Sequence, residues 1–240
     1  GQLTGRPRPD RLVLWDIDGT LIATSGIAQQ AFDLAVAHAL GRPAGDHAVR
    51  MSGKTDTSIA MEILAFAGLD EAGIGDHLPL VLHRLEAELA EAGDLVASQG
   101  HTKPGVPALL ARLHAEPRVL QSALTGNIAA NAVVKLAAFG LDELIDLDVG
   151  AYGSDHHDRE ELVPIALERA ARLRGHHFAP DQVWVIGDTP RDLACARAGG
   201  ARCLLVATGQ FTEAELRAAG PDRVVADLGD TDALVHLLLN

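Results

Sequence analysis

The sequence predicts an α/β fold: a Rossmann-like parallel sheet covered by helices on both faces, with an inserted block of helices. From about residue 104 onward, short apolar runs alternate with longer segments of helical periodicity. Such alternation is typical of a parallel sheet built by right-handed crossovers. Residues 22–100 contain no convincing strand, so they predict a separate helical unit. Polar residues directly follow several of the apolar runs.

The first strand is predicted at Arg11–Trp15, an apolar run that ends at Asp16. A buried parallel strand that leads into a polar loop has this pattern. The following block should contain three helices, the second capped by Thr55 or Asp56. Their expected ranges are about 27–41, 56–66 and 78–92.

After Pro104 and Gly105, strands and helices should alternate to the end of the chain. Helices are expected at about 106–114, 128–139, 161–173, 191–198 and 232–239. Strands are expected at about 118–124, near Leu147, at 182–186 and 202–207, and near Val224. The predicted domains are therefore a core of residues 1–21 and 101–240 and a helical cap of residues 22–100.

Composition excludes several classes of protein. The chain has 240 residues, 48% of them hydrophobic and 22% charged, which is typical of a globular protein with a sizeable core. A net charge of −13 argues against nucleic acid as the main partner. No apolar run is long enough to span a membrane. The two cysteines, Cys195 and Cys203, indicate reduced thiols in a cytoplasmic protein. For the oligomeric state, the sequence leaves both a monomer and a homodimer open.

Acidic and hydroxyl residues follow three predicted strands: Asp16 and Asp18, then Thr125, then Asp188. Sites in open parallel sheets form at the carboxyl ends of the strands, so these groups should meet at one edge. A carboxylate can attack phosphorus, and a second can act as general acid and base. A divalent cation would offset the repulsion from phosphate, and an oxygen-lined site suits Mg²⁺. Two solvated aspartates in a polar loop are the weaker alternative, because the DxDGT pattern is restrictive.

A second acidic cluster is formed by Asp188 and Asp192. On its own, GDxxxD is a weak signal that favours a capped helix start, with Asp188 or Thr189 as the cap. Together with Asp16 and Asp18, it favours metal ligation by Asp188, with Asp192 contributing through water.

Phosphate-binding residues are expected in two further loops. Thr125, Gly126 and Asn127 open a helix, whose free N–H groups can bind an anion; simple N-capping is an equal alternative. Phosphoryl transfer also needs a cation. No lysine follows Lys135, so Arg159 is the best-placed candidate, although it could be an ordinary surface arginine. His156 and its neighbour His157 are expected in a solvated loop.

These motifs resemble those of the haloacid dehalogenase (HAD) superfamily of hydrolases, especially its phosphoglycolate-phosphatase-like members. The resemblance covers nearly the whole chain. Asp16-Ile17-Asp18-Gly19-Thr20 matches the first motif, Thr125-Gly126-Asn127 the second, and Gly187 to Asp192 the fourth.

The resemblance implies Asp16 as nucleophile and Asp18 as general acid and base. It also implies Mg²⁺ held by Asp16, the backbone carbonyl of Asp18, and Asp188. Thr125 and Asn127 would hold the phosphate, and Gly19 of the first motif would lie beside it.

Two further residues carry expectations from the resemblance. The segment Gly53-Lys54-Thr55-Asp56 is similar to the cap loop that contacts substrate, so Lys54 is a candidate substrate ligand. The third motif is usually a lysine, and Arg159 is its expected replacement. Since dehalogenases lack the second aspartate of the first motif, Asp18 favours phosphoryl transfer over carbon–halogen cleavage.

The sequence therefore predicts a Mg²⁺-dependent phosphatase that hydrolyses a small phosphorylated metabolite through an aspartyl phosphate. Two alternatives stay open. One is a phosphomutase of the same fold, and the other is a non-catalytic HAD-like binding protein. The sequence does not name the substrate.

Overall fold

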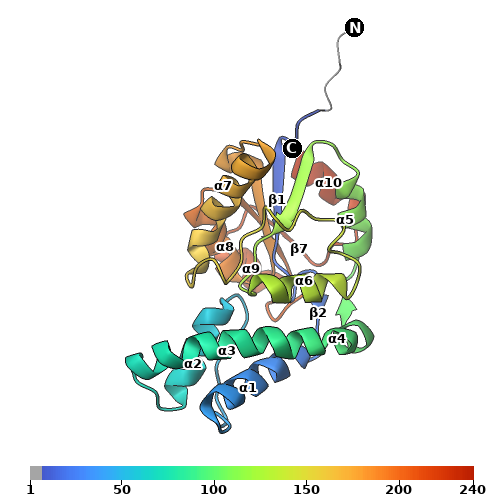
Figure 1. Ribbon diagram of the computed structural model, residues 1–240. Helices are drawn as coiled ribbons and strands as arrows, with labels where there is room; N and C mark the ends of the chain where they lie inside the picture. The colour runs from blue at the N-terminus through green and yellow to red at the C-terminus, as the bar shows by residue number, and fades with distance from the viewer. Residues whose placement is uncertain (1–6) are drawn as a thin grey trace.

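The computed structural model describes residues 7–240, and its centre is a five-stranded parallel sheet. The strand order is β4–β1–β5–β6–β7. Helices flank this sheet, so the predicted fold class is confirmed (Figure 1). The strands are β1 (Arg11–Trp15), β4 (Val119–Ala123), β5 (Val183–Gly187), β6 (Arg202–Val206) and β7 (Arg223–Val225).

Two layers of helices cover the sheet, and the alternation of side chains along β1 shows why. Val13 and Trp15 pack on one face, whereas Leu12 and Leu14 pack on the other. The first face is covered by α5 (Val106–His114), α6 (Ala129–Ala137) and α10 (Thr231–Leu239). The second face is covered by α7 (Leu162–Arg174), α8 (Pro190–Ala198) and α9 (Glu213–Ala219).

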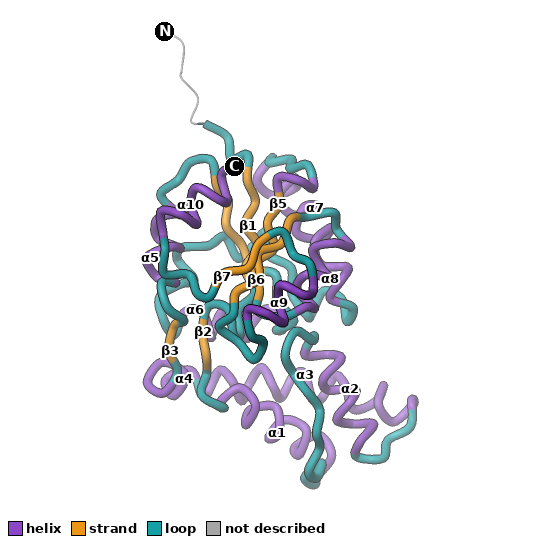
Figure 2. The backbone as a smooth tube through the Cα atoms, turned by 180° about the vertical axis from the view of Figure 1, so that it is seen from behind, coloured by secondary structure: helices purple, strands orange, loops and turns teal. Residues whose placement is uncertain are grey.

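A helical unit lies beyond the carboxyl end of the sheet, with α3 beside α6 (Figures 1 and 2). It has its own hydrophobic core, which includes Phe32, Ile63 and Leu85. A short antiparallel pair, β2 (Ile22–Ala23) and β3 (His101–Thr102), lies where the chain leaves the sheet and returns to it. The helices are α1 (Ile27–Leu40), α2 (Asp56–Phe66), α3 (Glu71–Glu91) and α4 (Gly93–Gln99).

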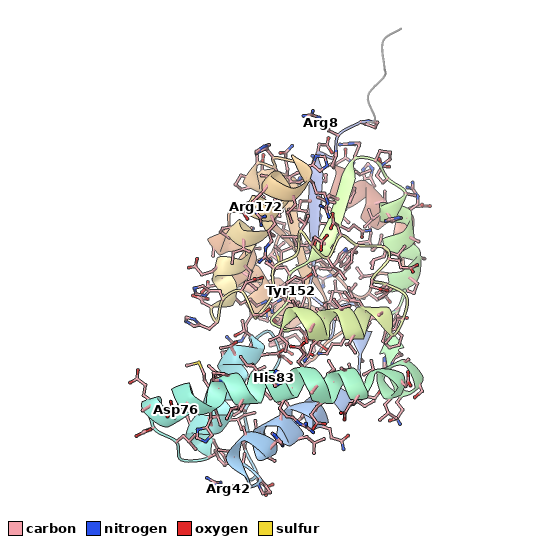
Figure 3. All side chains as sticks on the ribbon, viewed as in Figure 1. Arg8, Arg42, Asp76, His83, Tyr152 and Arg172 are labelled. Atoms are coloured by element: carbon pink, nitrogen blue, oxygen red, sulfur yellow. The ribbon has the colours of Figure 1, made fainter. Side chains whose placement is uncertain are left out.

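Figure 3 marks the two ends of this arrangement. Arg8 lies beside the end of the sheet where β1 begins, and Arg42 lies at the far end of the helical unit. The junction between sheet and helical unit is therefore in the middle of the molecule. None of the helices in residues 7–240 combines the length and the apolar character needed to cross a membrane.

The helical unit differs from the sequence prediction at several points. The third helix begins at Glu71 rather than near Leu78, because Asp70 caps it by accepting a 2.8 Å hydrogen bond from the Gly73 N–H. Pro79 lies inside this helix, so the proline does not mark its start. The seven-residue helix α4 and the two-residue strand β2 were not predicted, since neither is long enough to show a periodicity.

The strand predicted near Leu147 is wrong. The chain forms turns there, and only an isolated bridge joins Leu124 to Ala151. The Leu147 carbonyl instead accepts a 2.6 Å hydrogen bond from the Tyr152 hydroxyl. Helix α9, between β6 and β7, was also missed by the sequence analysis.

Candidate active site

Three loops that are far apart in the sequence meet at the carboxyl ends of neighbouring strands. The Asp16 N–H donates a 2.9 Å hydrogen bond to the Ile186 carbonyl in β5. On the other side of β1, the Leu124 N–H donates to the Trp15 carbonyl at 2.8 Å. The parallel register therefore brings the residues that follow β1, β4 and β5 to one edge, next to the helical unit.

The carboxylates of Asp16, Asp188 and Asp192 form a buried cluster. One oxygen of each lies within 4.8 Å of the others. Burial, reinforced by the neighbouring carboxylates, raises the pKa of Asp16 well above its ordinary value, although Arg159 opposes this rise. Burial and the charge of Asp192 raise the pKa of Asp188 to about 7. When all three carboxylates are ionised, the cluster thus has more negative charge than its protein surroundings balance.

Arg159 is the cation of this cluster. It is 7% exposed, which rules out the alternative of a surface arginine. Its Nη2 lies 3.2 Å from Asp16 Oδ1 and forms a closer ion pair with Asp192. Burial alone would lower the pKa of Arg159, but Asp192 and Asp16 outweigh it and raise the pKa. The Nε atom is buried and has no hydrogen-bond partner within the described chain.

Asp192 is fully engaged by the protein. Its Oδ2 accepts hydrogen bonds from the Thr189 N–H at 3.0 Å and from the Thr189 hydroxyl at 3.1 Å, at the start of α8. Its Oδ1 pairs with Arg159. Asp188 is freer, because its side chain accepts a single hydrogen bond from outside the acidic cluster, from the Thr20 hydroxyl at 3.0 Å. Thr189 is therefore the N-cap of α8, with Asp192 as its capping partner. Asp188 does not cap the helix and instead lines the cavity.

Lys135 is a site residue that the sequence analysis did not identify. From helix α6, its Nζ donates to both oxygens of Asp18 at 2.9 Å and to Asn127 Oδ1 at 2.6 Å. Lys135 is 5% exposed and sits beside Leu136 on the buried face of α6. A lysine on the apolar face of an amphipathic helix was the signal that could have revealed it.

Asp18 differs from the buried cluster, because 47% of its side chain is exposed. Partial burial would raise the pKa of Asp18, but the charge of Lys135 and the hydrogen bonds from Lys135 and Asn127 outweigh it and lower the pKa. The Asn127 Nδ2 donates to Asp18 at 2.8 Å. In this structure Asp18 is therefore held as a carboxylate.

Thr125 and Asn127 form one compact turn after β4. The Asn127 N–H and Nδ2 donate to the Thr125 hydroxyl at 3.1 and 2.7 Å. Neither side chain caps α6, whose N-cap is Ile128. The Ile128 N–H instead donates at 2.9 Å to the carboxylate of Asp56, which comes from the helical unit. The N-capping alternative for Thr125 and Asn127 is therefore wrong.

Gly19 and Gly126 allow close approach of other groups. Gly19 has φ of +83°, and a Cβ there would collide with the Asp188 carboxylate. A Cβ on Gly126 would collide with the Lys54 carbonyl of the helical unit. The absence of a side chain at Gly19 thus lets the carboxylate of Asp188, a candidate metal ligand, lie against the loop after β1. At Gly126 it lets the loop of the helical unit pack against the turn after β4.

The loop at residues 53–57 holds the helical unit closed over the strand ends. The Asp56 N–H donates to the Gly126 carbonyl at 2.8 Å, and the Thr55 hydroxyl donates to the His157 carbonyl at 2.8 Å. Arg159 Nη1 donates to the Gly53 carbonyl at 3.0 Å. Burial raises the pKa of Asp56 to about 6.

Lys54 lies in the same loop, but its Nζ pairs with Glu62 at 2.7 Å. The stacked rings of His156 and His157 lie nearby, with His157 exposed. The one hydrogen bond of these rings in the described structure joins His156 Nδ1 to the Asp158 N–H at 2.9 Å.

These residues enclose a cavity of about 530 Å³ between sheet and helical unit. This volume is in the range of small-molecule sites. Asp16, Asp18 and Asp188 line its sheet end. Aliphatic and aromatic side chains of the helical unit line the other end, namely Phe32, Ile59, Leu85 and Leu89.

The family model that matches this chain, over residues 161–231, is described as HAD-hydrolase-like. Two curated relatives align over most of the chain. A probable phosphatase, IndB, of Dickeya dadantii is 30% identical over 95% of this chain and 94% of its own length. A phosphoglycolate phosphatase of Pseudomonas putida is 28% identical over 91% of this chain and 77% of its own.

Solved structures share the fold. A hydrolase from Pseudomonas syringae superposes with a TM-score of 0.67 at 21% identity, covering 95% of this chain and 97% of that one. At 21% sequence identity, this structural similarity supports the fold and not a shared function.

Proposed function

The chain belongs to the HAD-like hydrolase family, and on that premise we propose that it is a Mg²⁺-dependent phosphatase. Its substrate is a small phosphorylated metabolite, and Asp16 attacks the phosphorus. The observation that carries the proposal is the buried cluster of Asp16, Asp188 and Asp192, with Arg159 as its one close cation in the described chain. Shifted pKa values in a cavity of this kind are typical of functional sites.

The donor set fits Mg²⁺. Lys135 balances Asp18, so Arg159 alone faces three carboxylates, and an excess of two negative charges remains when all are ionised. Asp16, the backbone carbonyl of Asp18, and Asp188 would hold the ion, since Asp192 already has its hydrogen bonds. Oxygen ligands of this type suit Mg²⁺, which would neutralise charge on the phosphoryl group.

In the first step, an Asp16 oxygen forms a bond to phosphorus and the bond to the leaving oxygen breaks. The leaving oxygen takes a proton from Asp18. Arg159 fixes the Asp16 carboxylate, and its guanidinium supplies positive charge beside the phosphoryl group. Thr125 and Asn127 bind the phosphoryl group from the end of β4.

In the second step, Asp18 removes a proton from water, which attacks the phosphorus and releases Asp16 and inorganic phosphate. The pairing with Lys135 favours this step, because it keeps Asp18 ionised. The first step requires Asp18 to be protonated. An entering phosphoryl group shares the Lys135 ammonium and adds negative charge, and both effects raise the pKa of Asp18.

The closed loop at residues 53–57 supports the same function, because exclusion of water strengthens electrostatic interactions in the cavity. Opening of the helical unit would admit the substrate. The segments Ser25–Gly26 and Gly100–Gly105 connect the unit to the sheet, and they are the proposed hinges.

The experiment that tests the proposal is a phosphate-release screen across phosphorylated metabolites with Mg²⁺ present. Asp16→Asn should abolish release. Asp46→Asn is the matched control, because Asp46 is exposed and has no side-chain hydrogen bond within the described chain. Wild-type protein that releases no phosphate from any substrate, or Asp16→Asn protein that keeps its activity, would overturn the proposal. Isomerised sugar phosphate without free phosphate would identify a phosphomutase instead.

A further inference from the structure

Among the described residues that line the cavity, one buried polar side chain has no hydrogen-bond partner. Asn131 is 2% exposed and lines the cavity from helix α6. Its Oδ1 is buried and has no hydrogen-bond partner, and no side-chain hydrogen bond of Asn131 occurs in the described chain. Buried amides are almost always paired, so an unpaired one needs an explanation. The amide Nδ2 also has no hydrogen-bond partner in the described chain but is not enclosed, so it is the end that a bound molecule in the cavity can reach.

The position of Asn131 relates it to the reacting groups. It lies four residues before Lys135, so both side chains are on the same face of α6. Lys135 contacts Asp18, the proposed proton donor to the leaving oxygen. Asn131 lies one turn away on α6, the helix that packs against α3, and α3 contributes Leu85 and Leu89 to the cavity lining. A group attached to the leaving oxygen would therefore reach Asn131.

Three of the four cations that line the cavity are already paired with carboxylates, which leaves little positive charge for an acidic leaving group. Of the cations that line the cavity, Lys54 pairs with Glu62, and Lys135 with Asp18. Arg159 pairs with the acidic cluster. Lys103 is the one lining cation without a salt bridge among the described residues. The Asp56 carboxylate adds negative charge to the same cavity.

We infer that Asn131 recognises a hydroxyl group of the leaving group, so that the substrate is the phosphate monoester of an uncharged, hydroxylated molecule. A hydroxyl fits because it both donates and accepts, and so it pairs with either end of the amide. The aliphatic wall of Leu85 and Leu89 contacts the carbon chain. This inference rests on the proposed phosphatase function and adds the class of substrate.

The test compares ribitol phosphate with pentyl phosphate, which has the same chain length and no hydroxyl groups. We expect the wild-type enzyme to prefer ribitol phosphate. Asn131→Leu should lower kcat/KM for ribitol phosphate about tenfold, the worth of one neutral hydrogen bond near its upper range. It should leave pentyl phosphate and p-nitrophenyl phosphate unchanged.

Thermal unfolding separates recognition from a structural role. Asn131 has no protein partner, so Asn131→Leu should leave the Tm unchanged or raise it. Asn131→Ala provides a second variant in case leucine does not fit. An equal loss of activity on all three substrates, or a Tm lowered by more than about 4 °C, would overturn the inference. Unchanged activity on ribitol phosphate would do the same.

A fourth substrate, phosphoglycolate, tests whether the cavity instead binds a leaving group that carries a carboxylate. If the wild-type enzyme prefers it and Lys103→Gln removes that preference, the cavity binds a carboxylate and the inference is wrong, although the phosphatase function stands. If the wild-type enzyme hydrolyses none of the four substrates nor any other phosphate monoester, the proposed function itself fails, and this inference fails with it.

Discussion

Replacement of Arg159 by methionine should destabilise the protein by about 3–5 kcal/mol when Mg²⁺ is absent. This is the usual cost of removing one partner of a buried ion pair. Arg159 is 7% exposed, and the side chains of its two partners, Asp16 and Asp192, are 7% and 0% exposed, so solvent screens neither pair. At an effective dielectric constant of about 20, each close pair is worth roughly 4 kcal/mol before desolvation is counted. Protonation of one carboxylate would recover part of this loss.

Urea unfolding in the presence of EDTA measures the effect, with the slope of the transition checked for two-state behaviour. Arg172→Met is the matched control. Arg172 pairs with Glu168 at 2.7 Å, but both side chains are more than half exposed, so the loss should be within about 0.5 kcal/mol. The loss of unfolding free energy in Arg159→Lys should lie between the losses in these two variants. Lysine keeps the positive charge but lacks the planar guanidinium, which contacts both the acidic cluster and the Gly53 carbonyl.

The reasoning would be refuted if Arg159→Met and Arg172→Met had the same stability. That result would mean that the acidic cluster does not need its cation, so its negative charge could not be the reason for binding Mg²⁺. A second check uses Mg²⁺ itself, which should recover part of the lost stability of Arg159→Met.

Three further predictions concern the reacting groups and the metal. Asp18→Asn should slow turnover by roughly 10²–10⁴, the usual contribution of general acid–base catalysis, and steady-state rates within a few-fold of wild type would remove Asp18 from that role. Lys135→Met should lower kcat by about ten- to a hundredfold, because Asp18 loses two charge-assisted hydrogen bonds; an unchanged pH–rate profile would show that Lys135 does not act through Asp18. Mg²⁺ at about a hundred times its Kd should stabilise the fold by about 2.7 kcal/mol above pH 7 and by less near pH 5, as measured by thermal unfolding. The pKa of Asp188 is raised to about 7, so the metal-free protein loses stability as the pH rises from about 4 to about 7, and Mg²⁺ must displace the Asp188 proton at any pH below about 7. Stabilisation that is equal at both pH values would contradict the assignment of Asp188.

Much of the fold follows from local sequence patterns. The strand Arg11–Trp15 and the helix Val106–His114 were predicted with the bounds observed, because a buried run that ends in a polar loop and an amphipathic segment that follows Pro104 and Gly105 are local signals. Short elements such as α4 and α9 have too few residues to show a period. The region around Leu147 resembled a strand because apolar and acidic residues alternate there, but its backbone forms hydrogen-bonded turns.

The site could be predicted where residues follow strands, and not where they depend on packing. Asp16 and Asp188 come together because the parallel register places the ends of β1 and β5 side by side. Lys135 was missed because its role depends on the rotation of α6 against the sheet, which brings a helix-interior lysine to Asp18. The unpaired amide of Asn131 likewise has no signal in the sequence. The loop contacts that close the helical unit, such as Asp56 with Ile128, join segments 72 residues apart.

The most direct test is to find where the phosphoryl group becomes attached during turnover. Asp18→Asn protein is mixed with p-nitrophenyl phosphate and Mg²⁺, because this leaving group needs little protonation, and the reaction is quenched in acid for peptide mass spectrometry. The account predicts a phosphorylated peptide that contains Asp16, absent in Asp16→Asn protein. Phosphate release that proceeds with no phosphorylated peptide at any time, or with the phosphate on another residue, would contradict it.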